Sequence, residues 1–152
     1  MSESGLVGGF VTFRLGEREF AAPLGGIREV LRLEGLLALP GMVPPMAGVI
    51  EVRGVPLPVM DVRPEPGAPG DVLVLTDDRA AGGPDSDANN HAIGIAVDGV
   101  TAVRGPGELR HDDGGEVPVG LPGYVVEVLR EATTSKPVLL VDLRRMLELV
   151  AA

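Results

Sequence analysis

The chain has 152 residues, of which 45% are hydrophobic, so it can bury a core as one domain or as two small lobes. Its net charge of −9 disfavours binding to the phosphates of nucleic acids, and 3% aromatic residues provide too few rings to stack bases. The absence of cysteine excludes disulfides, iron–sulfur clusters, cysteine-bound zinc and thiol nucleophiles.

The N-terminal residues 1–9 are neither basic nor a long apolar run, so we expect a flexible segment that is not a secretion signal. No apolar run approaches the roughly 18 residues of a membrane span. These features predict a cytoplasmic protein with no direct membrane insertion.

Valine-rich runs separated by glycine and proline predict a β-rich first half. Ile27, Val30 and Leu31 are spaced at i, i+3 and i+4, which predicts a short helical turn between strands. The prolines of residues 39–45 exclude regular structure there, and the Pro- and Gly-rich residues 64–70 are the strongest linker candidate. The predicted strands of this half cover residues 10–15, 19–24, 47–53 and 56–62.

The second half continues the β pattern and ends in a helix. Residues 78–90 are small and polar and predict a loop, and the Gly- and Pro-rich residues 105–123 predict irregular structure. Asp142 is a good N-cap for a helix whose apolar face carries Leu143, Met146, Leu147 and Val150. The predicted strands of this half cover residues 71–76, 91–97, 124–130 and 137–141.

Three segments of the first half are echoed in the same order in the second half, which indicates two related lobes. We therefore predict an all-β fold with a first lobe over 10–66 and a second over 71–150, in which an exchange of terminal strands between the lobes is allowed. Small lobes bury little surface alone, so we expect them to share an interface with a binding groove. The echoed pairs are 22–30 with 95–103, 49–52 with 125–128, and 59–63 with 140–144.

Few residues suit catalysis. The chain has no phosphate-binding Gly-x-x-x-x-Gly-Lys-Ser/Thr loop and no Gly-x-Ser-x-Gly nucleophile turn. His111 beside Asp112 and Asp113 suggests a metal site, but the spacing matches no known ligand set, so a solvated loop is favoured. We predict no catalytic residue, no metal and no cofactor.

Two aspartates follow strands of opposite halves. Asp61 and Asp142 are candidates for an acid–base pair, yet Asp142 is better explained as a helix cap. Arg53 ends an apolar strand directly before Gly54, so its charge must reach the surface or be paired. Arg53 is therefore the residue most indicative of a site.

The segment around Arg53 resembles the signature of the CheW family of chemotaxis coupling proteins. The resemblance is strongest in Gly48-Val49-Ile50-Glu51-Val52-Arg53-Gly54 and in the Asp61-Val62-Arg63 that follows, and it extends over about residues 10–149. It implies two small SH3-like five-stranded β-barrels with short connecting helices and a C-terminal helix. It also implies a non-enzymatic adaptor.

The resemblance also implies partners and a site. The partners are the regulatory domain of the histidine kinase CheA, through apolar faces at the lobe ends, and the cytoplasmic tip of chemoreceptors in membrane-associated arrays. Glu29 and Arg53 match the family's ion pair. The residues that match the receptor-binding groove are Ile27, Glu29, Gly48, Val52, Arg53 and Gly54.

The chain departs from the family pattern at two places, and two other functions remain open. Glu51 stands where the family commonly has Asn, so a second carboxylate could compete for Arg53, and the 64–70 stretch replaces a helix. One alternative is the same adaptor in a non-chemotactic pathway, such as pilus motility or gene regulation. The other is a small-molecule binding or hydrolytic domain that uses Asp61, Asp98 or His91 as acid or base.

Overall fold

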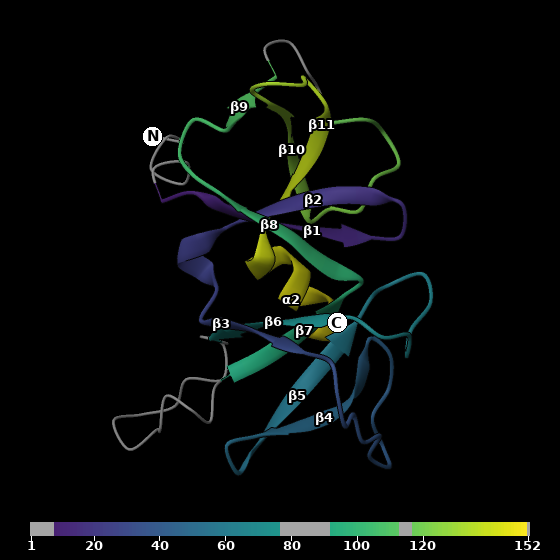
Figure 1. Cartoon of the computed structure of the whole chain (residues 1–152). Helices are drawn as coiled ribbons and strands as arrows, with labels where there is room; N and C mark the ends of the chain where they lie inside the picture. Colours follow the sequence, from purple (N-terminus) through teal and green to yellow (C-terminus); the bar gives the residue numbers. More distant parts are fainter. Residues whose placement is uncertain (1–7, 77–91, 113–116, 152) are drawn as a thin grey trace, which may run out of the picture. The chain divides into compact units, whose positions relative to one another are not determined.

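The structure is a computed structural model that describes residues 8–76, 92–112 and 117–151 (Figure 1). The predicted loop at 78–90, His91, Asp113 and most of the predicted flexible N-terminus lie outside the described residues. The described part is mainly β, with two sheets and one short C-terminal helix, as the sequence predicts.

The chain forms two compact units that are interleaved in sequence. Residues 27–98 form the continuous unit, and residues 1–26 with 99–152 form the discontinuous unit. The sequence predicts consecutive lobes over 10–66 and 71–150, whereas each unit takes strands from both of those ranges. The reason is strand pairing, because two parallel pairs join strands that are far apart in the chain.

The sheet of the continuous unit has five strands within the described residues, in the order β3-β6-β7-β5-β4. Its one parallel pair is β5 with β7, and its other neighbours are antiparallel. The strands are β3 (Glu29–Arg32), β4 (Met46–Val52), β5 (Val55–Asp61), β6 (Asp71–Thr76) and β7 (Ala92–Val97).

The sheet of the discontinuous unit has six strands within the described residues, in the order β8-β1-β2-β11-β10-β9. Here the parallel pair is β2 with β11. The unit also contains a 3-10 helix, η1 (Leu24–Gly26), and the helix α2 (Leu143–Ala151). The strands are β1 (Phe10–Leu15), β2 (Arg18–Pro23), β8 (Gly99–Arg104), β9 (Leu109–His111), β10 (Val125–Glu131) and β11 (Pro137–Val141).

The two sheets share one topology, which gives the sequence repeat a structural meaning. Strands β3-β6-β7-β5-β4 of one sheet correspond in order and direction to β8-β1-β2-β11-β10 of the other. Each echoed segment falls on corresponding strands: β2 into β3 matches β7 into β8, β4 matches β10, and β5 matches β11. In the discontinuous unit, the hairpin β1–β2 from the start of the chain completes a sheet made of later strands.

The correspondence extends to local irregularities. The β4–β5 register shifts between Met46 and Gly48, and the β10–β11 register shifts at the corresponding place, between Val125 and Glu127. Glycines with positive φ precede both strands, Gly41 at 89° and Gly120 at 100°. Paired features of this kind in two sheets indicate a duplicated unit.

Three predictions about local structure need correction. The helical turn predicted at Ile27–Leu31 is wrong, because Glu29–Arg32 forms strand β3 and pairs with β6. The side chains of β3 alternate between half-buried and exposed, which is the two-residue period of a strand. The helical spacing of the apolar residues here is coincidental. One sheet has six strands instead of five, since the region predicted as irregular contains β9. Strand β8 was also not predicted.

Each unit has its own core. In the continuous unit the buried cluster comes from four strands, and in the discontinuous unit Phe10 and Ala21 pack with residues of β9, β10 and β11. The face of α2 that carries Leu143, Met146 and Leu147 is buried, as predicted. The cluster of the continuous unit contains Ile50, Leu57, Val59, Val72, Val74 and Ala96.

Candidate functional site

The β4–β5 hairpin of the continuous unit ends in a strained turn. Val52 pairs with Val55, so the turn consists of two residues, Arg53 and Gly54, with φ of 49° and 81°. Positive φ at both central residues is the requirement of a type I′ turn, and glycine or asparagine normally fills the first position. An arginine with positive φ is therefore a conformational cost, which points to a function for its side chain.

The Arg53 guanidinium forms a two-bond ion pair with Glu29. Nη2 of Arg53 donates to Oε2 of Glu29 at 2.6 Å, and Nη1 donates to Oε1 at 3.3 Å. The hydrogen bonding from Arg53 lowers the pKa of Glu29, and the same interaction raises the pKa of Arg53. Because 70% of the Arg53 side chain is exposed, the pair lies at the surface and remains accessible to a partner.

This ion pair connects the two edges of one sheet. Glu29 begins β3 and Arg53 follows β4, and these strands stand at opposite ends of the order β3-β6-β7-β5-β4. A 2.6 Å contact between them requires the sheet to curl until its edges approach. The isolated bridge between Leu37 and Val49 closes the same seam further along β4.

A pocket of about 300 Å³ opens beside the ion pair, within the continuous unit. Glu29, Arg53 and Arg28 supply its charged groups, and the other lining residues are apolar. All five strands contribute at the same end of the sheet, so the pocket is the mouth of the curled sheet. The remaining lining residues are Val52, Val55, Pro56, Leu57, Val74 and Ala92.

The structure brings together part of the predicted receptor-binding set. Glu29, Val52 and Arg53 line the pocket, and Gly54 completes the turn beside them. Ile27 is half-buried just before β3 and is not among the lining residues. Glu51 is exposed and neighbours Val52 in an extended strand, so its side chain points to the opposite face.

Gly48 has a packing role instead. A Cβ at this position would lie 2.4 Å from the main-chain oxygen of Leu37, so no side chain fits. The close approach permits the Leu37–Val49 bridge, with N–O distances of 2.8 and 2.9 Å. Gly48 thus supports the seam without lining the pocket.

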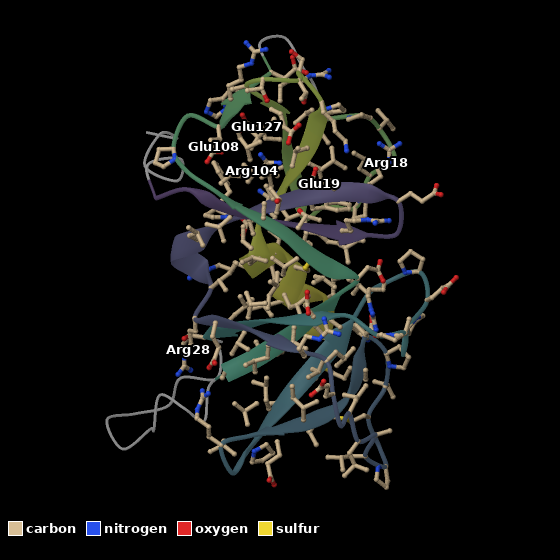
Figure 2. The ribbon with its side chains drawn as sticks, in the orientation of Figure 1. Arg18, Glu19, Arg28, Arg104, Glu108 and Glu127 are labelled. Atoms are coloured by element: carbon tan, nitrogen blue, oxygen red, sulfur yellow. The ribbon has the colours of Figure 1, made fainter. Side chains whose placement is uncertain are left out.

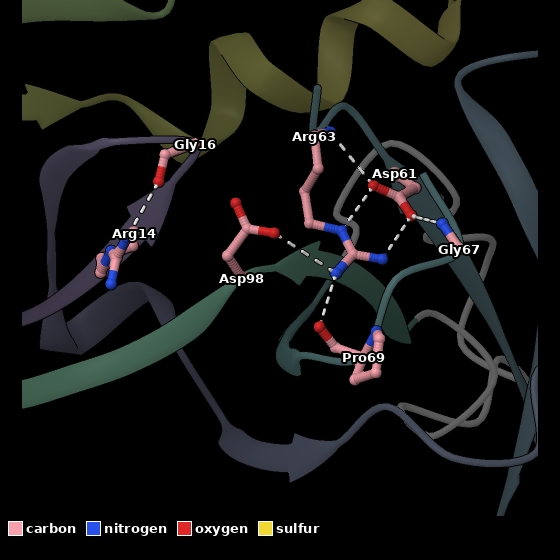
Figure 3. Close-up of polar contacts among 7 residues, drawn as sticks. All are labelled: Arg14, Gly16, Asp61, Arg63, Gly67, Pro69 and Asp98. Carbon is pink, nitrogen blue, oxygen red and sulfur yellow. Dashed lines mark hydrogen bonds and ion pairs between the residues drawn. The ribbon is translucent and has the colours of Figure 1, made fainter. Parts of the chain in front are cut away.

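Asp61 belongs to a buried ionic cluster that binds the 64–70 segment (Figure 3). Nε and Nη2 of Arg63 donate to its two carboxylate oxygens at 2.9 and 2.8 Å, and both side chains are at most 1% exposed. The amide of Gly67 donates to Asp61, and Arg63 donates to the main-chain oxygen of Pro69. The linker candidate is therefore a loop held within the continuous unit.

The cluster stabilises the ionised form of Asp61. Burial raises the pKa of Asp61, but hydrogen bonds from the Arg63 side chain and main chain and from Gly67 outweigh this effect, so the pKa lies below its usual value. Asp98 lies 3.6 Å from Nη1 of Arg63 in the same cluster. A carboxylate held this way is a poor proton donor or acceptor, which disfavours the predicted acid–base role for Asp61. His91 lies outside the described residues.

The discontinuous unit carries a separate polar network, which includes Arg104 and Glu127 (Figure 2). Arg104 pairs with Glu131 at 2.5 Å, Nδ1 of His111 contacts Oε2 of Glu127, and Arg130 pairs with Asp112 at 3.1 Å. These contacts join β8, β9 and β10 across the sheet. Within residues 8–76, 92–112 and 117–151, no three His, Asp or Glu side chains gather as a metal site would require.

Apart from Val52, sequence reasoning missed the apolar lining of the pocket. Pro56 and Leu57 lie on β5, just after the turn, and β5 pairs with β4. Following the register of the predicted hairpin onward from the turn would have identified them. Val74 and Ala92 lie on β6 and β7, and Arg28 directly precedes β3. The pairing of these strands is not evident from the sequence. Arg28 immediately precedes Glu29, and its positive charge also lowers the pKa of Glu29.

Comparisons with known proteins agree on the fold. The CheW-like domain matches residues 9–151. A crystal structure of the scaffolding protein TtCheW from Thermoanaerobacter tengcongensis is similar with a TM-score of 0.61 and 16% identity, over 88% of each chain. Protein PilI from Pseudomonas aeruginosa is 44% identical over 52 residues, which is 34% of this chain but only 29% of PilI.

In the described part of the chain, no helix has both the length and the apolar character needed to cross a membrane.

Proposed function

The chain belongs to the CheW-like domain family, a family of non-catalytic scaffolding domains, and from this premise we propose that it is a chemosensory adaptor. CheW-like scaffolds generally bind a kinase and receptors. We propose specifically that this chain couples chemoreceptors to the histidine kinase CheA in cytoplasmic arrays at the membrane.

The observation that carries the proposal is the Arg53 turn. An arginine takes a backbone conformation that glycine or asparagine would adopt more easily, and its exposed side chain is held by Glu29 over an apolar pocket. Such an arrangement suits recognition of a protein segment that brings both polar and apolar groups. We assign receptor binding to Glu29, Val52, Arg53 and Gly54, with Ile27 and Gly48 as supporting residues.

The test uses purified chain, the regulatory domain of a CheA kinase from the same organism, and a soluble receptor tip. We expect the chain to bind each partner separately and to join them in one complex in size-exclusion chromatography. Binding to neither partner would refute the proposal. An Arg32→Ala variant is a suitable control, because Arg32 is an exposed arginine of β3 that does not line the pocket.

The similarity to PilI favours a second version of the same adaptor role, in a pilus-related chemosensory system. In that case the chain binds the kinase of the pilus system in preference to the kinase of the swimming system. Deletion of the gene would then impair surface motility and leave swimming intact. Competition binding with the two kinase regulatory domains separates these versions directly.

A further inference from the structure

The mouth of the curled sheet combines features that define one kind of ligand. Leu57 and Val74, in the core of the continuous unit, help to line the pocket, so an entering apolar group reaches the core of that unit. An engineered cavity of about 150 Å³ accommodates benzene. A pocket of about 300 Å³ is therefore large enough for a branched aliphatic or aromatic side chain.

The rim of this pocket presents an exposed cation. Arg53 lines the pocket and keeps its guanidinium accessible, although the chain as a whole carries −9. An accessible guanidinium attracts an anionic group. The anion must lie near Arg53, since the guanidinium is 70% exposed at the rim.

The Arg53 guanidinium also has N–H groups that the bonds to Glu29 do not use. A guanidinium carries five N–H groups, and the two hydrogen bonds to Glu29 use two of them. Within the described part of the chain, its side-chain hydrogen bonds go to Glu29 alone. Glu29 thus fixes the plane of the guanidinium and leaves three donors, enough for a second carboxylate.

We infer that the pocket accepts an apolar side chain of the receptor whose neighbouring residue carries a carboxylate, and that Arg53 binds this carboxylate while the apolar side chain enters the cavity. The inference rests on the proposed receptor-binding function and names the chemistry that the receptor must present. Glu29 has two effects in this arrangement: it orients Arg53, and it competes with the incoming carboxylate.

The experiment uses small probes, so that it does not depend on the identity of the receptor. N-acetyl-Leu-Glu-amide is titrated into the labelled full chain and followed by NMR, beside N-acetyl-Leu-Gln-amide and N-acetyl-Ala-Glu-amide. We expect shifts at the amides of Glu29, Val52 and Arg53, and affinity at least about threefold higher for Leu-Glu than for either other probe. Higher salt should weaken only the binding of the two anionic probes.

Variants make the test specific. Arg53→Asn should abolish the preference for Glu over Gln, and Arg32→Ala should preserve it. Glu29→Gln should raise the affinity for Leu-Glu about threefold, because it removes the competing carboxylate; a purely structural role for Glu29 would lower it. Equal affinity for Leu-Glu and Leu-Gln, shifts located elsewhere, or no shifts at tens of millimolar probe would overturn the inference.

The failure of this inference can be distinguished from the failure of the proposed function. If receptor and kinase bind but the probes show no preference, the adaptor role stands and the carboxylate inference falls. If the probes show the preference but neither macromolecule binds, the pocket chemistry stands and the adaptor role falls.

Discussion

Asp61 and Asp142 occupy corresponding positions: Asp61 is the last residue of β5, and Asp142 directly follows β11. The main-chain amide of Asp61 donates a hydrogen bond of 2.8 Å to the main-chain oxygen of Pro45, directly before β4. The amide of Asp142 donates a bond of the same length to the main-chain oxygen of Tyr124, directly before β10. Their side chains then differ: Asp61 binds the buried Arg63, and Asp142 accepts hydrogen bonds from the amides of Arg144 and Arg145 at the start of α2. One backbone position thus serves two structural roles, and neither is catalytic.

Removal of Asp61 should destabilise the fold strongly. Asp61→Ala leaves the buried Arg63 without its carboxylate, so we expect a loss of about 3 kcal/mol in the free energy of unfolding. Urea denaturation followed by circular dichroism measures this loss. Asp98→Asn is the matched control and should cost less, because its contact with Arg63 is 3.6 Å long and partly exposed. Similar losses in both variants would contradict the assignment.

The same cluster predicts an acid-sensitive fold. The pKa of Asp61 is lower in the folded chain than its ordinary value near 4, so the unfolded chain takes up the proton first as pH falls. The stabilisation is fully present above pH of about 4 and is lost as pH falls through the folded pKa. Between about pH 5 and 2, unfolding free energy should decline more steeply in the native chain than in Asp61→Asn. An equal decline of the unfolding free energy in both chains would show that another carboxylate controls the acid sensitivity.

The cap of α2 should contribute a smaller amount. Asp142→Ala removes the oxygen that accepts from the amides of Arg144 and Arg145, at 2.9 and 3.3 Å, and should cost about 1 kcal/mol. Asp142→Ser retains an acceptor and should recover most of this stability. Thermal melts of both variants compare them. An unchanged melting temperature in Asp142→Ala would mean that packing of Leu143, Met146 and Leu147 alone holds the helix.

Replacement of Arg53 should separate folding from receptor binding. Arg53→Asn creates the Asn-Gly pair that type I′ turns prefer, so the melting temperature should stay the same or rise. We expect receptor-tip binding to weaken at least tenfold and kinase binding to remain within about twofold, by calorimetry with both partners. Equal loss of both interactions in a folded variant would contradict the placement of the receptor site at Arg53.

Gly48 should show the opposite behaviour. Gly48→Ala forces a Cβ against the Leu37 main-chain oxygen at 2.4 Å, so the seam must shift and the fold should lose at least about 1 kcal/mol. Both partner interactions should then weaken together with stability. A stable Gly48→Ala variant that loses receptor binding alone would instead assign Gly48 to the binding surface.

Most strands were predictable because valine-rich runs and glycine turns are local signals. The hairpins around Gly16 and Gly54 and the helix after Asp142 fall within a residue or two of their predicted positions. Strand β3 has only four residues, and a pattern this short fits both the helical and the strand period, so the sequence predicts a helical turn there. Its strand conformation depends on pairing with β6. The six-stranded sheet could not be foreseen, since β9 has only three residues.

The site was predictable only in part. Arg53 stands out from the sequence as a charge between an apolar strand and a glycine, and its pairing with Glu29 follows from the family resemblance. The apolar lining depends on strand order, and strand order depends on the parallel pairs β5–β7 and β2–β11, for which the sequence carries no local signal. The alternation of apolar residues identifies which side chains of a strand are buried, but it does not identify the neighbouring strand.

The interleaved order of the units has a consequence for biosynthesis. Strand β2 ends at Pro23, but its parallel neighbour β11 begins at Pro137, so the ribosome finishes the two strands roughly ten seconds apart. An isolated hairpin such as β1–β2 is at best marginally stable in water. Residues 27–98 emerge as one continuous stretch and can complete their sheet first. The nascent chain must therefore keep the phenylalanines of its first hairpin from aggregating until its last strand arrives.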